Sequence, residues 1–548
     1  MKWTSQIYAD MLQLNTVYSS LSDMLCVTVK LDILILAFVR TTELQGDLSR
    51  LAYFSNRSGN TNIAARISMN NPPWPNGKKV VHLDLKGAPP KVEYIFQLIE
   101  CFSRLGADGL LVEYEDMFPY EGELKLLQAT SQPAYSRDQI LAIQKVAKSK
   151  GMEIIPLVQT FGHLEFVLKH RPMWSLREVS NCVGTLNPHK EEGFKLVMEM
   201  LRQVVELHPG LNALHIGADE VYMLGEGELS KLWLASSGRT VEQLFLSHVA
   251  SIVKYIKKEW PHMTIIMWDD MMRGMSQDTL KASGIVGFVQ PMLWDYTPNL
   301  DVDKTVSLLE KYYSAGMQDM WAASSFKGST SVYTNVPSTQ RHVDNHLQWL
   351  KVVGSVSPVL NMRGIAITGW QRYDHLSVLC ELMPVGLPSL AACLQTLIHG
   401  QFSPEAKNKA SEMLGVSSVE VETMGSTLDD ATLFPGRRLA ESIVELDSIL
   451  CNEDIRSFEK NIYVRGWFSP YHRSRRMANP FITGQIQSQA SMYLALLQQK
   501  ADVVREEMCH LYPDSTAQEW IDEHVSPVTA PLWRILDEIA ACATEIVP

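Results

Sequence analysis

The sequence predicts an α/β fold, a (β/α)8 barrel of the TIM type, followed by a helical region. From residue 78 to about residue 373, eight short apolar runs alternate with longer stretches of helical periodicity. This alternation favours a closed parallel barrel over an open sheet, because a helix separates each strand from the next. The expected strands are residues 80–85, 109–113, 153–158, 213–216, 264–268, 285–289, 320–324 and 364–368.

Helical periodicity defines the segments between the strands and the whole C-terminal part of the chain. Helices are expected at 94–105, 137–150, 192–207 and 241–258 within the barrel, and at 438–450, 486–507 and 531–546 after it. The run from Asn70 to Gly77 holds three prolines and reads as a boundary. We therefore divide the chain into an N-terminal extension (1–77), for which disorder is one expectation, a barrel (78–384) and a helical region (385–548).

Composition excludes several classes of protein. Hydrophobic residues make up 46% of the chain and charged residues 20%, as in ordinary globular proteins. A net charge of −12 argues against a nucleic-acid partner, which would require a basic face. The eight cysteines are dispersed and form no Cys-x-x-Cys pair, so no zinc or redox motif is present and a reducing compartment is favoured.

The N-terminal part carries no convincing export or membrane signal. The apolar stretch 24–39 is interrupted by Lys30 and Asp32. Its clean part is too short to span a bilayer, and it lies too far from Met1 for a typical signal peptide. We expect a cytoplasmic or nuclear protein without a membrane partner.

The run His215-Ile-Gly-Ala-Asp219-Glu220 is the most informative motif, because an apolar strand ends there in two adjacent carboxylates. Carboxylates at the mouth of a core are costly unless the site uses them. A second interpretation has Asp219 capping a following helix, with Glu220 in its first turn. The motif alone leaves both interpretations open.

Polar and aromatic residues gather at the expected carboxyl ends of the strands, where barrels of this kind place their active sites. Aromatic rings can stack on the apolar face of a pyranose, while acids, Arg and Gln bond its hydroxyls. The pattern therefore predicts a carbohydrate site. The residues at the strand ends include His82, Asp84, Lys86, Glu113, Glu115, Gln159, His163, His215, Trp268, Asp270, Trp294, Tyr296, Trp370 and Arg372.

Two other hydrolytic mechanisms are compatible with parts of this set. A conventional retaining glycosidase would pair Glu220 with a second carboxylate such as Glu115 or Asp270, about 5 Å away. A metal-dependent hydrolase would hold zinc on histidines and an aspartate of the barrel strands. Its zinc ligands would be His82, Asp84, His163 and His215. However, no His-x-His occurs on the first strand, and a metal-dependent hydrolase does not need the tryptophans and acids. We therefore predict no metal and no cofactor.

Three motifs together resemble family 20 of the glycoside hydrolases, the β-N-acetylhexosaminidases. They are the run from His215 to Glu220, Phe161-Gly-His163 and Gly369-Trp370. The family signature reads His-x-Gly-Gly-Asp-Glu, so this chain departs from it only at Ala218. The runs 81–90 and 113–120 place the chain near a branch of the family that lacks export signals and favours galacto-configured amino sugars. The resemblance extends from about residue 78 to the C-terminus.

The resemblance implies retaining exo-hydrolysis of terminal β-linked N-acetylhexosamines, with the substrate's own acetamido group as the nucleophile. Glu220 would act as general acid and then as general base. Asp219 would orient the acetamido N–H and stabilise the oxazolinium intermediate. We expect the neighbouring Asp219 and partial burial to raise the pKa of Glu220. A catalytically silent barrel that binds amino sugars remains the alternative from another class.

The resemblance also suggests roles for the other site residues. Trp370 and Trp294 would wall the pocket, beside Trp268, and Tyr296 would bond the acetamido oxygen. His163 and His215 would tune Glu220 or be ordinary buried histidines. Secreted members carry an arginine after the first strand, where this chain has Lys86 or Asp84. Hydroxyl recognition is therefore assigned to Asp84, Glu115 and Arg372. The expected partner is a glycan with terminal N-acetylhexosamine, favouring N-acetylgalactosamine over N-acetylglucosamine, and the prediction allows for a homodimer.

Overall fold

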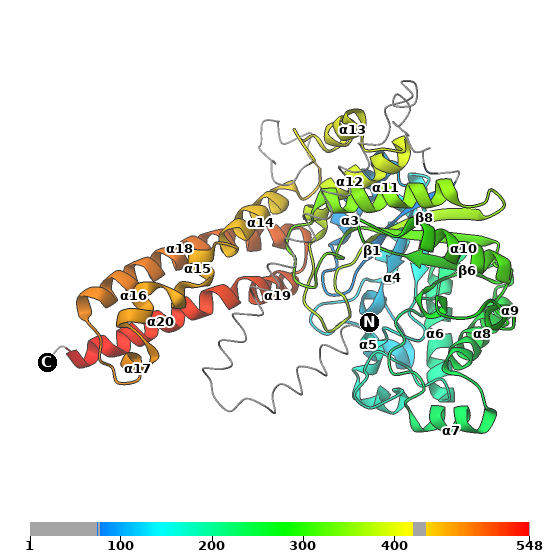
Figure 1. Ribbon diagram of the computed structural model, residues 1–548, viewed down its shortest axis with the longest axis horizontal. Helices are drawn as coiled ribbons and strands as arrows, with labels where there is room; N and C mark the ends of the chain where they lie inside the picture. The colour runs from blue at the N-terminus through cyan, green and yellow to red at the C-terminus, as the bar shows by residue number, and fades with distance from the viewer. Residues whose placement is uncertain (1–73, 75–76, 420–433, 547–548) are drawn as a thin grey trace, which may run out of the picture. The chain divides into compact units, whose positions relative to one another are not determined.

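A computed structural model of the protein confirms the predicted closed barrel of eight parallel strands (Figure 1). The structure describes residue 74 and residues 77–419 and 434–546. The extension 1–77, with its apolar stretch, lies outside the described residues except for Trp74 and Gly77. Strand β8 pairs in parallel with β1 and closes the barrel. The strands are β1 (Lys78–Asp84), β2 (Gly109–Glu113), β3 (Glu153–Leu157), β4 (Ala213–His215), β5 (Thr264–Trp268), β6 (Val289–Trp294), β7 (Asp319–Lys327) and β8 (Asn361–Gly369).

The prediction of the sixth strand was wrong. It was expected at 285–289, but β6 begins at Val289, where the expected strand ends. Gly284 and Gly287 both adopt positive φ, so the apolar run between them forms a turn. The true strand was hidden because Gln290 interrupts its apolar pattern. The Gln290 side chain accepts a hydrogen bond from Trp321 Nε1 at 2.8 Å, a partner that is not apparent in the sequence.

Each strand of the barrel is followed by a helix of the outer layer. The helix after β5 is short, with only 5 residues. Two of the helices begin with a reciprocal capping box, formed by Ser136 with Gln139 in α4 and by Thr240 with Gln243 in α8. The helices of this layer are α3 (Val92–Leu105), α4 (Arg137–Ser149), α6 (Glu191–Leu207), α8 (Val241–Glu259), α9 (Gln277–Lys281), α10 (Val302–Ala315), α11 (Thr339–Ser355) and α12 (Met383–His399), with α5 (Glu165–Leu168) and α7 (Glu228–Ser237) in loops.

Helix α12 is the eighth helix of the barrel layer. It packs against α11, α3 and strands β7 and β8. The boundary proposed at residue 384 falls in the first turn of this helix, so most of α12 would lie on the C-terminal side of that boundary although it contacts the barrel. The barrel interior itself is filled by apolar side chains from all eight strands, including Ile266, Trp268, Met292 and Trp321.

The residues after α12 form helices in every described element, as predicted. Helices α14, α18 and α20 run side by side (Figure 1). None of the helices in the described residues is long and apolar enough to cross a membrane. The helices are α13 (Pro404–Leu414), α14 (Arg437–Leu450), α15 (Glu453–Arg456), α16 (Ile462–Trp467), α17 (Pro470–Arg473), α18 (Pro480–Leu511), α19 (Asp514–His524) and α20 (Ser526–Ile546).

Candidate active site

The acid pair lies on a left-handed turn that follows β4. Gly217, Ala218 and Glu220 have φ angles of 62°, 66° and 44°. A Cβ on Gly217 would lie 2.0 Å from the Gln159 side-chain oxygen, so only glycine fits there. Ala218 adopts a conformation that glycine prefers, which explains why the family signature has glycine at this position. The turn directs both carboxylates away from the regular strand.

The helix-cap interpretation of Asp219 was wrong. The next helix, α7, begins only at Glu228 and is preceded by Gly227. Asp219 instead accepts a hydrogen bond from Gln159 Nε2 at 3.0 Å, and the Gln159 oxygen accepts one from the Ala218 amide at 3.2 Å. Burial raises the pKa of the Asp219 carboxyl. Gln159 at the end of β3 therefore orients the acid that ends β4.

His163 connects the two acids. Its Nε2 lies 3.1 Å from Glu220 Oε2 and 3.7 Å from Asp219 Oδ2, and its Nδ1 lies 3.9 Å from Glu165 Oε2. Burial alone would lower the pKa of His163, but the nearby carboxylates, Asp219 first, outweigh burial and raise it to about 10. His163 is therefore a cation at neutral pH.

The expectation of a raised pKa for Glu220 was wrong for this geometry. The hydrogen bond with cationic His163 lowers the pKa of Glu220, and this effect exceeds that of partial burial. The Glu220 side chain is 38% exposed, so burial is weak, and the influence expected from Asp219 is not among the main causes. A histidine in contact with the acid could not be deduced from sequence spacing alone.

Asp270 holds the backbone of Glu220. Its Oδ2 accepts a hydrogen bond from the Glu220 amide at 2.9 Å, and its Oδ1 accepts one from Trp294 Nε1 at 3.3 Å. Burial, followed by repulsion from Asp219, raises the pKa of Asp270 to about 7. From the sequence, Asp270 was expected only as a possible second carboxylate of a conventional glycosidase. Its position after strand β5 was the available signal, but its role in orienting Glu220 was missed.

The acids face a cavity of about 250 Å³ at the carboxyl end of the barrel. Trp294 and Tyr296 stack on one another with centroids 5.5 Å apart, and Arg273 lies over the Trp294 ring. Trp370 rests on His82 and on the fully buried Trp268. The lining residues are Lys86, Glu113, Gln159, His163, Asp219, Glu220, Trp294, Tyr296, Gly328, Ser329, Trp370 and Tyr373.

Several predicted site residues lie behind the cavity wall. His215 is completely buried, and its Nδ1 accepts a hydrogen bond from the Gly217 amide at 3.0 Å, so it shapes the turn. Trp268 is buried beneath Trp370. Arg372 forms an ion pair with Glu519 of the C-terminal helical region, a distant partner that the sequence did not suggest. These three side chains are therefore not assigned to substrate contact.

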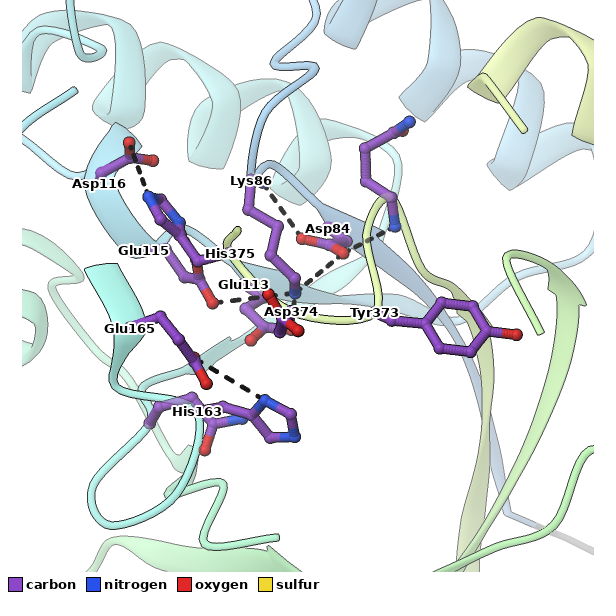
Figure 2. Close-up of polar contacts among 12 residues, drawn as sticks. Asp84, Lys86, Glu113, Glu115, Asp116, His163, Glu165, Tyr373, Asp374 and His375 are labelled. Carbon is purple, nitrogen blue, oxygen red and sulfur yellow. Dashed lines mark hydrogen bonds and ion pairs between the residues drawn. The ribbon is translucent and has the colours of Figure 1, made fainter. Parts of the chain in front are cut away.

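Asp84 and Glu115 also lie behind the wall, where they hold Lys86 (Figure 2). Lys86 Nζ lies 3.0 Å from Asp84, 3.5 Å from Glu113 and 3.8 Å from Glu115. Burial disfavours the charge, but the three carboxylates outweigh it and raise the pKa of Lys86. Burial would raise the pKa of Glu113, but Lys86, His82 and His163 together outweigh burial and lower it to about 2. Lys86 and Glu113 therefore present a fixed cation and a fixed anion to the cavity.

Glu115 has a second contact that extends the cluster to the loop after β8. His375 Nδ1 lies 2.7 Å from Glu115 Oε2, and Lys169 Nζ lies 2.7 Å from His375 Nε2. Burial lowers the pKa of His375 to about 4 and raises that of Glu115. The contact ties the loop after β2, which carries Glu115, to the loop after β8, which carries His375 (Figure 2). Lys169 adds the loop after β3.

The proposed zinc ligands do not converge. In the part of the chain that the structure describes, no group of three or more His, Cys, Asp or Glu side chains is arranged to hold a metal ion. His82 lies against Glu113, with Nε2 3.2 Å from Oε2, while His215 bonds the turn after β4. The donor set of a metal-dependent hydrolase is therefore not assembled from these residues.

Comparison with known proteins identifies the family. Residues 107–305 match the family model "Glycosyl hydrolase family 20, catalytic domain". The chain is 46% identical to hexosaminidase D of Homo sapiens over 474 residues, which cover 86% of this chain and 96% of that protein. The chain belongs to glycosyl hydrolase family 20. It is accordingly a glycosidase of the β-N-acetylhexosaminidase class, as the resemblance implied.

Two further proteins are similar. Hexosaminidase D of Bos taurus is 52% identical over 342 residues, covering 62% of this chain and 98% of that protein. The solved structure of a Flavobacterium johnsoniae chitobiase of this family superposes with a TM-score of 0.48 at 15% identity, covering 86% of this chain and 72% of that one.

The raised pKa of His163 predicts a specific pH dependence of stability. The folded-state pKa of about 10 exceeds the ordinary value of 6.5, so the contribution of His163 is complete below about pH 6.5 and is lost as pH rises towards 10. We expect the difference in thermal midpoint between wild type and His163→Gln to be largest near pH 6 and to shrink towards pH 10. Thermal unfolding across this range measures it. A constant difference, or one matched by the exposed control His510→Gln, would contradict the assignment.

Proposed function

We propose that the protein removes terminal β-linked N-acetylhexosamines with retention of configuration, using the substrate's acetamido group as nucleophile. The observation that carries the proposal is that Asp219 and Glu220 share one wall of the cavity, both in contact with His163. A conventional mechanism requires a free carboxylate on the opposite face of the sugar. The carboxylates available for that role are all committed to other contacts.

Three carboxylates near the cavity could be considered as the nucleophile, but none is free to attack the sugar. Glu115 does not line the cavity, and burial raises its pKa. Asp270 also lies outside the cavity lining, and its oxygens accept bonds from the Glu220 amide and Trp294. Glu113 lines the cavity, but it is held by Lys86 and His82. The acetamido oxygen of the substrate supplies the nucleophile that these three carboxylates do not.

The reaction proceeds in two steps, formation of the oxazolinium and its hydrolysis. First, the acetamido oxygen attacks C1 while Glu220 donates a proton to the departing glycosidic oxygen, which leaves with the pair of electrons of the C1–O bond. Asp219 accepts a hydrogen bond from the acetamido N–H and stabilises the positive oxazolinium. Second, Glu220 removes a proton from water, which attacks C1 and reopens the oxazolinium ring. Two inversions at C1 give net retention.

Glu220 must begin as an acid in this mechanism, although His163 lowers its pKa in the free site. A sugar that fills the cavity removes water from around Glu220 and so raises its pKa. His163 Nε2 lies 3.1 Å from Glu220 Oε2, so this contact orients the acid.

Lys86 and Glu113 are assigned to the ring hydroxyls, in place of Asp84, Glu115 and Arg372. Lys86 can donate to hydroxyl oxygens and Glu113 can accept from hydroxyl groups, and both line the cavity. Tyr373 also lines the cavity as a further polar group. We also propose a preference for N-acetylgalactosamine over N-acetylglucosamine, which the resemblance supports.

We further propose that the protein acts in the cytoplasm or nucleus. Six cysteines of the described residues carry free thiols, and Cys451 among them is exposed; they are Cys101, Cys182, Cys380, Cys393, Cys451 and Cys509. Free exposed thiols persist in a reducing compartment. Fractionation of cells that express the chain, followed by immunoblotting, tests this proposal, and recovery in the secreted fraction would contradict it.

Substitution of the acid pair tests the proposed mechanism. We expect Glu220→Gln and Asp219→Asn to lower kcat on p-nitrophenyl β-N-acetylgalactosaminide by about 100-fold or more, because each removes a group that acts in the transition state. The matching glucosaminide, assayed in parallel, measures the epimer preference as a ratio of kcat/KM values. Equal turnover by wild type and variants would refute the roles of both acids. A folded wild type that binds both sugars without turnover would instead indicate a silent binding protein.

Substitution of Lys86 tests hydroxyl recognition. We expect Lys86→Met to raise KM at least about tenfold, because the charged donor to the ring hydroxyls is lost. Its removal also leaves three buried carboxylates without their cation, so the free energy of unfolding should fall by about 3–5 kcal/mol at neutral pH. Steady-state kinetics and chemical denaturation measure the two effects. An unchanged KM in the folded variant would remove Lys86 from the binding site.

A further inference from the structure

The first turn of helix α19, in the C-terminal helical region, contacts the loops that follow β1 and β2. Thr516 Oγ1 donates to the Gly87 carbonyl oxygen, which follows β1, at 3.3 Å. Gln132, in the loop after β2, accepts hydrogen bonds from Ser515 at 3.0 Å and from Thr516 at 3.3 Å. The first turn of α19 therefore joins the β1 and β2 loops.

The other end of α19 contacts the loops after β7 and β8. The Tyr333 hydroxyl, after β7, donates to the Glu523 carbonyl oxygen at 2.8 Å. Glu523 Oε2 accepts a hydrogen bond from the Leu379 amide, after β8, at 3.0 Å. Glu519 forms an ion pair with Arg372, also after β8. One helix from outside the barrel thus contacts four of its eight catalytic-end loops.

The pair of Arg372 and Glu519 is built into a tight site. The Arg372 side chain is only 8% exposed. It packs so closely on Gly87 that a Cβ there would lie 1.9 Å from the guanidinium Nε, and Gly87 has a φ of 80°. A buried guanidinium requires a carboxylate partner, because an unpaired buried charge is strongly destabilising. Glu519 supplies that carboxylate from α19.

The loop after β8 carries two residues of the cavity wall, Trp370 and Tyr373. Its barrel side is fixed where the Gln371 amide donates to Asp84 Oδ2 at 2.7 Å and where His375 meets Glu115. Arg372 and Leu379 lie on the side that faces α19. The position of the Tyr373 backbone, between these anchors, therefore depends on contacts from both sides.

We propose that α19 is a positioning element of the active site, and that Glu519 and Glu523 fix the β8 loop so that Trp370 and Tyr373 form the sugar-binding wall. This inference rests on the proposed function for its kinetic readout. The helical region thereby contributes to substrate affinity although none of its described residues lines the cavity. Glu519 and Glu523 act through Arg372 and Leu379 and do not contact substrate.

The test compares three alanine substitutions on the same helix in the full chain. Glu519→Ala and Glu523→Ala remove the two loop contacts, whereas the control Asp522→Ala removes only a bond within α19, from Gln518 Nε2 at 2.9 Å. Alanine is the best helix former, so none of the three weakens α19 through helix propensity. We expect Glu519→Ala and Glu523→Ala to raise KM about tenfold with kcat within about twofold of wild type. Asp522→Ala should leave both constants unchanged.

Two further measurements separate positioning from general stability. Amide hydrogen exchange of residues 371–381 should become faster in Glu519→Ala and Glu523→Ala but not in Asp522→Ala. In a double-mutant cycle, Arg372→Ala and Glu519→Ala should be non-additive in KM, because they remove the same contact. Unchanged KM in both variants, or an equal rise in Asp522→Ala, would overturn the proposal. Faster amide exchange of the β8 loop in the two variants, in a protein without hexosaminidase activity, would support the role of α19 in positioning the loop and would refute the proposed function.

Discussion

The contact between His163 and the acid pair is the interaction on which the rest of the site depends. It requires a buried cation, two carboxylates on adjacent residues and a backbone that turns out of the β4 direction within a few residues. The left-handed conformations of Gly217, Ala218 and Glu220 provide that turn. Such conformations cost free energy for residues other than glycine, so surrounding contacts must hold them. Gln159 and Asp270 provide these contacts through the Ala218 and Glu220 amides.

A single histidine also reconciles two requirements that conflict. Catalysis by acid transfer needs a proton on Glu220, whereas folding of a partly buried carboxylate is favoured by a cationic partner. Because the pKa of His163 is raised to about 10, the proton resides on the imidazole while the carboxylate remains paired. The Glu220 carboxylate thus keeps a cationic partner in the partly buried site. Elsewhere in the cavity, Lys86 and Glu113 show the same principle, since each stabilises the charge of the other.

Sequence reasoning predicted the barrel because its signal is repeated eight times and each unit is local. It placed seven of the eight strands correctly and failed at β6, where Gln290 sits within a buried strand and pairs with Trp321. It also found the acid pair, because two carboxylates at a strand end are visible without knowledge of the fold. The pKa of Glu220 was misjudged, since it depends on the direction of the His163 side chain. Arg372 was assigned to substrate because its partner, Glu519, is 147 residues away in the chain.

The most direct test of the central claim varies the nucleophile itself. If the acetamido oxygen attacks C1, successive fluorination of the N-acetyl methyl group should withdraw electrons from that oxygen and slow the reaction at each step. The measurement is kcat/KM for p-nitrophenyl β-N-acetylgalactosaminides that carry none, one, two or three fluorine atoms on this methyl group. We expect a steep, monotonic decline, because the developing oxazolinium charge is destabilised in the transition state. A flat series would contradict it and would indicate that a carboxylate of the protein attacks C1.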